Sequence, residues 1–134
     1  MQELEMSLRN DLLKIGLDVD FNLSIRPYSK SYFGRYDVKS NTIILYVQKT
    51  PNGDMYPYCD LLLTVVHEAV HCVQWSNPKY ERVKGIMHNA EFKKLYAVYS
   101  NRAKARVLFG EVLGYDFVYQ ANYRKSCHRS GVVC

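Results

Sequence analysis

The feature that most constrains this chain is a long apolar segment that carries two histidines, CDLLLTVVHEAVHCVQW, at residues 59–75. Apolar residues recur in it at the spacing of one helix face, which predicts a helix with a buried stripe. The stripe consists of Leu62, Val66, Val70 and Val73. The turn-forming residues SNP at 76–78 end the helix. The most apolar run, LLLTVV, is far too short to span a membrane, so we expect no membrane partner.

Two histidines in this segment, His67 and His71, stand four residues apart. On a helix they project from the same face, one turn apart, and two imidazoles placed so can bind one zinc ion. Glu68 follows the first histidine and can reach a zinc-bound water without ligating the metal. This is the H-E-x-x-H arrangement of metallopeptidases, and it predicts a zinc site with Glu68 as general base. The alternative is a helix whose histidines are ordinary polar residues.

A catalytic zinc needs a third protein ligand and an open coordination position. The metzincin pattern would place Gly at position 74 and His at position 77, but the chain has Gln74 and Asn77, so that class is excluded. His88 lies just before the next predicted helix, where its side chain can swing back onto the first one. We favour His88 as third ligand. Glu91 is the alternative, although a carboxylate in a first helical turn also has a structural reason to be there.

The other segments predict an α+β fold in which helices pack on a small, mainly antiparallel sheet. Residues 2–15 carry one apolar helix stripe, which Gly16 ends. Three segments show strand-like alternation, at 21–25, 31–38 and 42–48, and Gly34 is a candidate bulge. A last helix is expected from an N-cap at Asn89 to about Leu108.

The chain has a net charge of +5, which permits an acidic partner such as nucleic acid. Basic residues that could contact phosphate are Lys79, Arg82, Lys84, Arg102, Lys104, Arg106, Arg124 and Lys125. A solvated basic surface is the alternative. Any of the 12 tyrosines could donate to an oxyanion, and the sequence does not choose among them.

The chain length and the N-terminal sequence indicate the domain organisation and the cellular location. A length of 134 residues favours one domain, placed at residues 1–110, with residues 111–134 as a C-terminal extension. The N-terminus MQELEMSLRND lacks the apolar region of a secretory signal. We therefore expect an intracellular, cytoplasmic protein with reduced thiols, and favour a monomer.

Three segments together resemble a known family. YFGRYDVKSNTIILYV, LLLTVVHEAVHCVQW and GIMHNAEFKKL occur in the order and spacing of the SprT-like metallopeptidases, which include Spartan. The resemblance covers residues 20–100 and implies a zincin-like fold. It also implies that His67, His71 and His88 bind zinc and that Glu68 is the general base. Asn89 stands where the family usually has glycine.

This resemblance implies a zinc-dependent endopeptidase with a protein substrate, and DNA as a candidate partner, since eukaryotic members cleave proteins crosslinked to DNA. Many members end in a zinc ribbon with two C-x-x-C knuckles. Here the tail carries only Cys127, His128 and Cys134, so a reduced remnant of a ribbon is the most it offers. The alternative function is a non-catalytic, zinc-stabilised module that binds DNA or protein.

Overall fold

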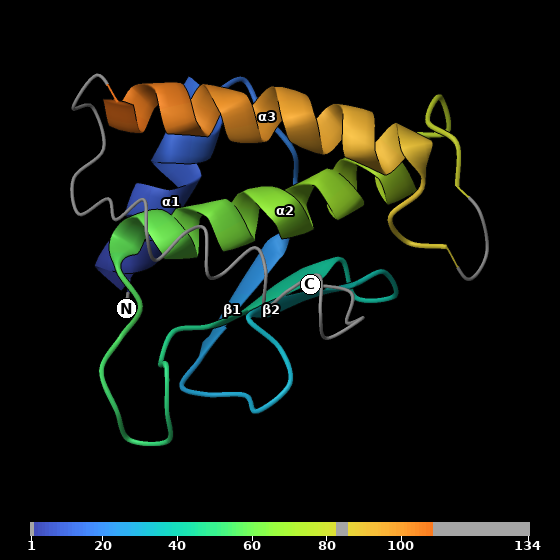
Figure 1. Cartoon of the computed structure of the whole chain (residues 1–134). Coiled ribbons are helices and arrows are strands. Elements are labelled where there is room, and N and C mark those ends of the chain that lie inside the picture. The colour runs from blue at the N-terminus through green and yellow to red at the C-terminus, as the bar shows by residue number, and fades with distance from the viewer. Residues whose placement is uncertain (1, 83–85, 109–134) are drawn as a thin grey trace.

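The computed structural model describes residues 2–82 and 86–108, and in these residues three helices pack with a three-stranded sheet. The elements are α1 (Gln2–Lys14), β1 (Asn22–Arg26), β2 (Gly34–Asp37), β3 (Thr42–Tyr46), α2 (Tyr58–Ser76) and α3 (Ala90–Leu108) (Figure 1). The expected α+β class is confirmed, and each expected element is present with ends shifted by a few residues at most. The predicted C-terminal extension, with Cys127, His128 and Cys134, lies outside the described residues.

The sheet has the order β1-β3-β2 and is mixed, so the expectation of a mainly antiparallel sheet is wrong in part. β2 and β3 form an antiparallel hairpin, whereas β1 runs parallel to β3. The segment that begins at Pro27 carries the chain from one side of β3 to the other, so β1 and β2 are not neighbours. β3 is therefore the central strand, and its inward residues Ile43 and Leu45 are fully buried.

Helix α1 ends where the sequence predicts, because Gly16 adopts φ +84°, which favours glycine. The backbone N–H of Leu17 donates to the carbonyl of Leu12 at 2.9 Å, and the N–H of Gly16 donates to Leu13 at 3.0 Å. These are the two bonds of a Schellman helix end. They turn the chain toward β1 and place Leu8 and Leu12 of α1 in the core.

Helix α2 lies between the sheet and α3, as Figure 1 shows. It is buried almost all round, from Cys59 to Gln74, so the predicted stripe with Leu62, Val66 and Val70 is enclosed together with most of the rest of the helix. Helix α2 packs on the sheet on one side and on α3 on the other, so both polar and apolar side chains are enclosed. No helix in the described ranges is long and apolar enough to cross a bilayer.

Asn41, in the turn between β2 and β3, fastens the sheet to α2. It adopts φ +50°, which asparagine tolerates better than most residues. Its Oδ1 accepts hydrogen bonds from the Tyr36 hydroxyl at 2.7 Å and from the Cys72 thiol at 3.3 Å, and its Nδ2 donates to the Asp20 carbonyl at 2.9 Å. One side chain thus joins the hairpin, the approach to β1 and the C-terminal part of α2.

Candidate metal centre

His67 and His71 lie on the face of α2 that is turned toward α3. Their ring centroids are 5.2 Å apart and the ring planes make an angle of 71°. His71 is fully buried, whereas His67 is half-buried. The i, i+4 spacing on a helix accounts for this pairing, as the sequence predicts.

The third histidine, His88, reaches the pair from the segment that precedes α3. Its Nε2 lies 3.1 Å from Nε2 of His67 and 3.2 Å from Nε2 of His71. Nitrogens bound to one tetrahedral zinc at ordinary Zn–N lengths are about 3.3 Å apart. The three ligand atoms all lie within 4.8 Å of one another, so the cluster is compact enough to hold one metal ion. Glu91, in the first turn of α3, does not belong to this group.

Aromatic rings of α3 pack against the imidazoles. The Phe92 ring is stacked on His71 at 4.3 Å between centroids and meets His67 edge-on at 4.9 Å. The Tyr96 ring meets His67 edge-on at 5.0 Å. Phe92 is buried, and such contacts restrict how far the imidazole rings can turn.

The sequence does not indicate which tyrosine could donate a hydrogen bond to an oxyanion. The structure places Tyr96 at the histidine cluster. The signal that could have found it is the helical spacing from Phe92 to Tyr96, four residues, which puts both on one face of α3.

Glu68 is fully buried beside the histidines. Neither of its carboxylate oxygens accepts a hydrogen bond from the residues that the structure describes. Burial raises the pKa of this carboxyl well above its usual 4.5, and the charge of Arg35 only partly opposes the shift. An enclosed carboxylate without donors lowers stability, and such groups concentrate at functional sites.

Edge strand β2 approaches Glu68 closely at Gly34. A Cβ on this glycine would lie 3.4 Å from Cγ of Glu68 and 2.7 Å from Cγ2 of Thr64. The expected bulge is absent, since β2 pairs with β3 in a regular register from Gly34 to Asp37. The glycine is therefore required by the close approach of strand and helix.

The predicted phosphate contacts do not gather on one surface of the described residues. Lys79 and Arg82 follow α2, in the segment whose Glu81 carbonyl accepts a hydrogen bond from Asn89 at the start of α3. The others that the structure describes lie in the last turns of α3. Those others are Arg102, Lys104 and Arg106. Arg102, the first of these, lies 12 residues after Ala90 (102 − 90) at the start of α3, a rise of about 18 Å that separates the two groups. Lys84, Arg124 and Lys125 lie outside the described residues.

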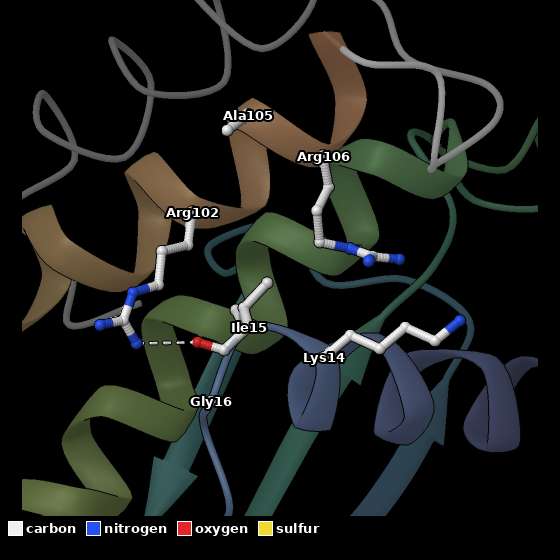
Figure 2. Close-up of a pocket in the computed structure, with 6 residues that line it drawn as sticks. All are labelled: Lys14, Ile15, Gly16, Arg102, Ala105 and Arg106. Carbon is white, nitrogen blue, oxygen red and sulfur yellow. Dashed lines mark hydrogen bonds between the residues drawn. The ribbon is translucent and has the colours of Figure 1, made fainter.

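Two of these basic residues, Arg102 and Arg106, bind other residues of the protein. They line a pocket of about 410 Å³ between α1 and α3, together with Lys14 and Gly16 (Figure 2). Arg102 donates to the carbonyl of Ile15 at 3.0 Å, as Figure 2 shows, and Arg106 pairs with Asp11 at 3.0 Å. Both arginines therefore join α3 to α1. Contact with nucleic acid stays a prediction.

Comparisons of this chain with protein-family models, with curated proteins and with solved structures give no match. What points to a function is therefore the geometry of the histidine cluster and its surroundings.

Proposed function

We propose that the chain is a zinc-dependent endopeptidase of the SprT-like type, with a zincin-like fold. The observation that carries the proposal is the cluster of three imidazoles, with Nε2 separations of 3.1 and 3.2 Å from His88, next to the enclosed carboxylate of Glu68. Three histidines and an open fourth position are a donor set of catalytic zinc sites.

In this proposal His67, His71 and His88 hold the ion. When bound, zinc supplies a Lewis acid that lowers the pKa of water and polarises the scissile carbonyl. The buried, donor-free oxygens of Glu68 fit the role of proton acceptor for that water. Without a cation, burial favours the protonated carboxyl, whereas a neighbouring dication opposes this effect and favours the carboxylate.

Glu68 then takes a proton from the attacking water and returns it to the leaving amine. The packing around α2 keeps bulk water from this carboxyl group, since Glu68 is fully buried. Exclusion of water strengthens electrostatic interactions at the reacting atoms.

The substrate class follows from edge strand β2. Among the described strands, β1 and β2 each have a neighbour on one side only, and β2 is the one whose first residue, Gly34, closely approaches α2 at Glu68. An extended peptide added to this edge would pass beside the catalytic carboxylate. We therefore propose extended or unfolded protein segments as substrates. Proteins bound or crosslinked to DNA are the class that the SprT-like resemblance implies.

The test is the variant Glu68→Gln, which keeps the size of the side chain and removes the base. We expect it to bind one equivalent of zinc and to cleave an unfolded protein at least about 100-fold more slowly than wild type, with and without single-stranded DNA. The matched control is Glu91→Gln, which changes the alternative ligand in the same way and is expected to retain both zinc and activity.

Three results would contradict the proposal. If Glu68→Gln holds zinc and cleaves at the wild-type rate, the mechanism is wrong. If wild type holds zinc but cleaves neither itself nor an unfolded protein, the non-catalytic binding module is the better description. If the purified chain binds no zinc, neither function stands.

A further inference from the structure

Gln74 is a buried polar residue on the histidine-bearing face of α2, with 1% of its surface exposed. It lies three residues after His71 and seven after His67, so the three side chains follow one another along the same side of the helix. Helix packing alone favours an apolar residue at such a position. The amide therefore needs an explanation in its contacts.

Both N–H groups of the Gln74 amide are used. Its Nε2 donates to the carbonyl oxygen of Glu81 at 2.6 Å and to Oδ1 of Asn89 at 2.8 Å. Asn89 completes the arrangement, since its Nδ2 donates to the same Glu81 carbonyl at 3.2 Å. The backbone N–H of Phe92 donates to Asn89 Oδ1 at 3.0 Å. Both partners of Gln74 are thus acceptors, which fixes the orientation of its amide.

These contacts act on the segment that supplies the third histidine. His88 does not belong to α2 or α3, so neither helix holds its backbone directly. Asn89 follows it immediately and caps α3 through Phe92. Gln74 therefore ties the chain to α2 at two points, Glu81 before His88 and Asn89 after it. His67, His71 and Gln74 share one rigid helix, so this link sets the place of His88 relative to the pair.

Stability of the fold does not account for Gln74. Its Oε1 is buried and accepts no hydrogen bond from the described residues. A buried acceptor without a donor lowers stability, and an apolar side chain of similar length would avoid this cost. Gln74 therefore has an unsatisfied oxygen that lowers stability, together with an amide nitrogen that makes both hydrogen bonds. This combination indicates a role in arranging His88.

We propose that Gln74 is a positioning residue of the metal centre, which holds His88 in place for a common ion with His67 and His71 by binding Asn89. The proposal rests on the proposed function only in taking the three histidines as metal ligands, and it does not require catalysis. Partners that orient metal ligands typically contribute about 10- to 100-fold in metal affinity.

The test compares zinc affinity and metal-free stability in Gln74→Met, which keeps the length of the side chain and removes the amide. Affinity is measured on the full chain by competition with a chromophoric zinc chelator, and stability by thermal unfolding after metal removal. We expect zinc affinity to fall roughly 10- to 100-fold. We expect the metal-free melting temperature to stay the same or rise, since an unsatisfied buried oxygen is removed. The visible spectrum of bound Co²⁺ should also lose intensity as the tetrahedral geometry loosens.

A second variant, Asn89→Ser, keeps a hydroxyl to cap α3 but is too short to reach Gln74. It should reproduce the affinity loss, and the double variant should lose little more, because both changes break one link. The matched control is Gln48→Met, the same substitution outside the histidine cluster, and it should bind zinc as wild type does.

The inference is overturned if wild type binds zinc and both Gln74→Met and Asn89→Ser bind it within about twofold of wild type. It is also overturned if these variants lose metal-free stability while their zinc affinity and Co²⁺ spectra stay unchanged. Failure of the proposed metal site itself gives a different result, since wild type would then bind no zinc.

Discussion

Gly34 and Glu68 are in near contact across the interface between β2 and α2, and a Cβ on the glycine would come within 3.4 Å of the glutamate Cγ. The same Cβ would lie 2.7 Å from Cγ2 of Thr64, which is closer than two carbon atoms can pack. Thr64 is buried, and its hydroxyl donates to the Asp60 carbonyl at 2.9 Å, so it cannot move aside cheaply. The close approach of β2 to the proposed base thus depends on the absence of a side chain at Gly34.

We therefore expect Gly34→Ala to lower the free energy of unfolding by about 1–3 kcal/mol, the usual cost of overpacking. It should also lower the rate at which the protein cleaves an unfolded substrate, because β2 must move away from Glu68. Urea denaturation and a cleavage assay check both effects. Ser31→Ala, at an exposed position before β2, is the control. Wild-type stability in Gly34→Ala would mean that strand and helix are not in close contact.

Tyr96→Phe tests the tyrosine that contacts His67. If its hydroxyl stabilises the oxyanion, its removal should lower kcat about 100- to 1,000-fold and leave zinc affinity unchanged. Steady-state kinetics and zinc competition measure the two quantities. Tyr99→Phe, three residues further on α3, should retain activity. Equal activity of the two variants would exclude Tyr96 from this role.

Removal of zinc should lower the melting temperature. A ligand that binds only the folded state, at about 100 times its Kd, stabilises that state by about 2.7 kcal/mol. We expect this gain when zinc is added to metal-free wild type, as measured by thermal unfolding. His71→Ala should show no such gain, because it removes the most buried ligand of the cluster. An identical response of the variant would place the bound ion elsewhere.

Stability at high pH should depend on Tyr58, whose hydroxyl donates to the Asp11 carboxylate. Burial, and next this hydrogen bond, raise the pKa of Tyr58 far above its usual 10.0. The folded state therefore holds the proton more tightly than the unfolded state. The resulting stability is fully present below about pH 10 and is lost as the pH rises further. Tyr58→Phe should reduce the loss of unfolding free energy between about pH 9.5 and 11.5, measured by urea denaturation. Parallel pH profiles for variant and wild type would contradict this.

Substitutions of Arg106 and Lys104 distinguish a structural role of the basic residues on α3 from a role in binding nucleic acid. The Arg106–Asp11 pair has side chains only 15% and 14% exposed, so Arg106→Gln should lower the unfolding free energy by about 1–3 kcal/mol. Lys104→Gln should change it by less than about 0.5 kcal/mol. If this face binds single-stranded DNA, Lys104→Gln should weaken binding and reduce the salt dependence by about one unit. Unchanged DNA binding in both variants would remove α3 from the candidate interface.

Local spacing was sufficient for much of this protein. The helices and strands follow from hydrophobic periodicity, and Asn89 caps α3 as its sequence position predicts. The pairing of His67 with His71 follows from helix geometry alone. Each of these features depends on residues within a few positions of one another, so the sequence carries the information directly.

Only the tertiary structure decided the features that join distant segments. The parallel pairing of β1 with β3 depends on where the chain crosses the sheet, which no local pattern encodes. The approach of His88 rather than Glu91 to the histidine pair depends on how the segment before α3 packs against α2. In the sequence Gln74 only excludes the metzincin pattern, whereas in the structure its amide donates hydrogen bonds to two points of that segment. The close fit of Gly34 against α2 likewise exists only once strand and helix have met. The sequence by itself determined which residues could serve as ligands and base, because residue type and helical spacing are local properties. Packing decided which of them meet.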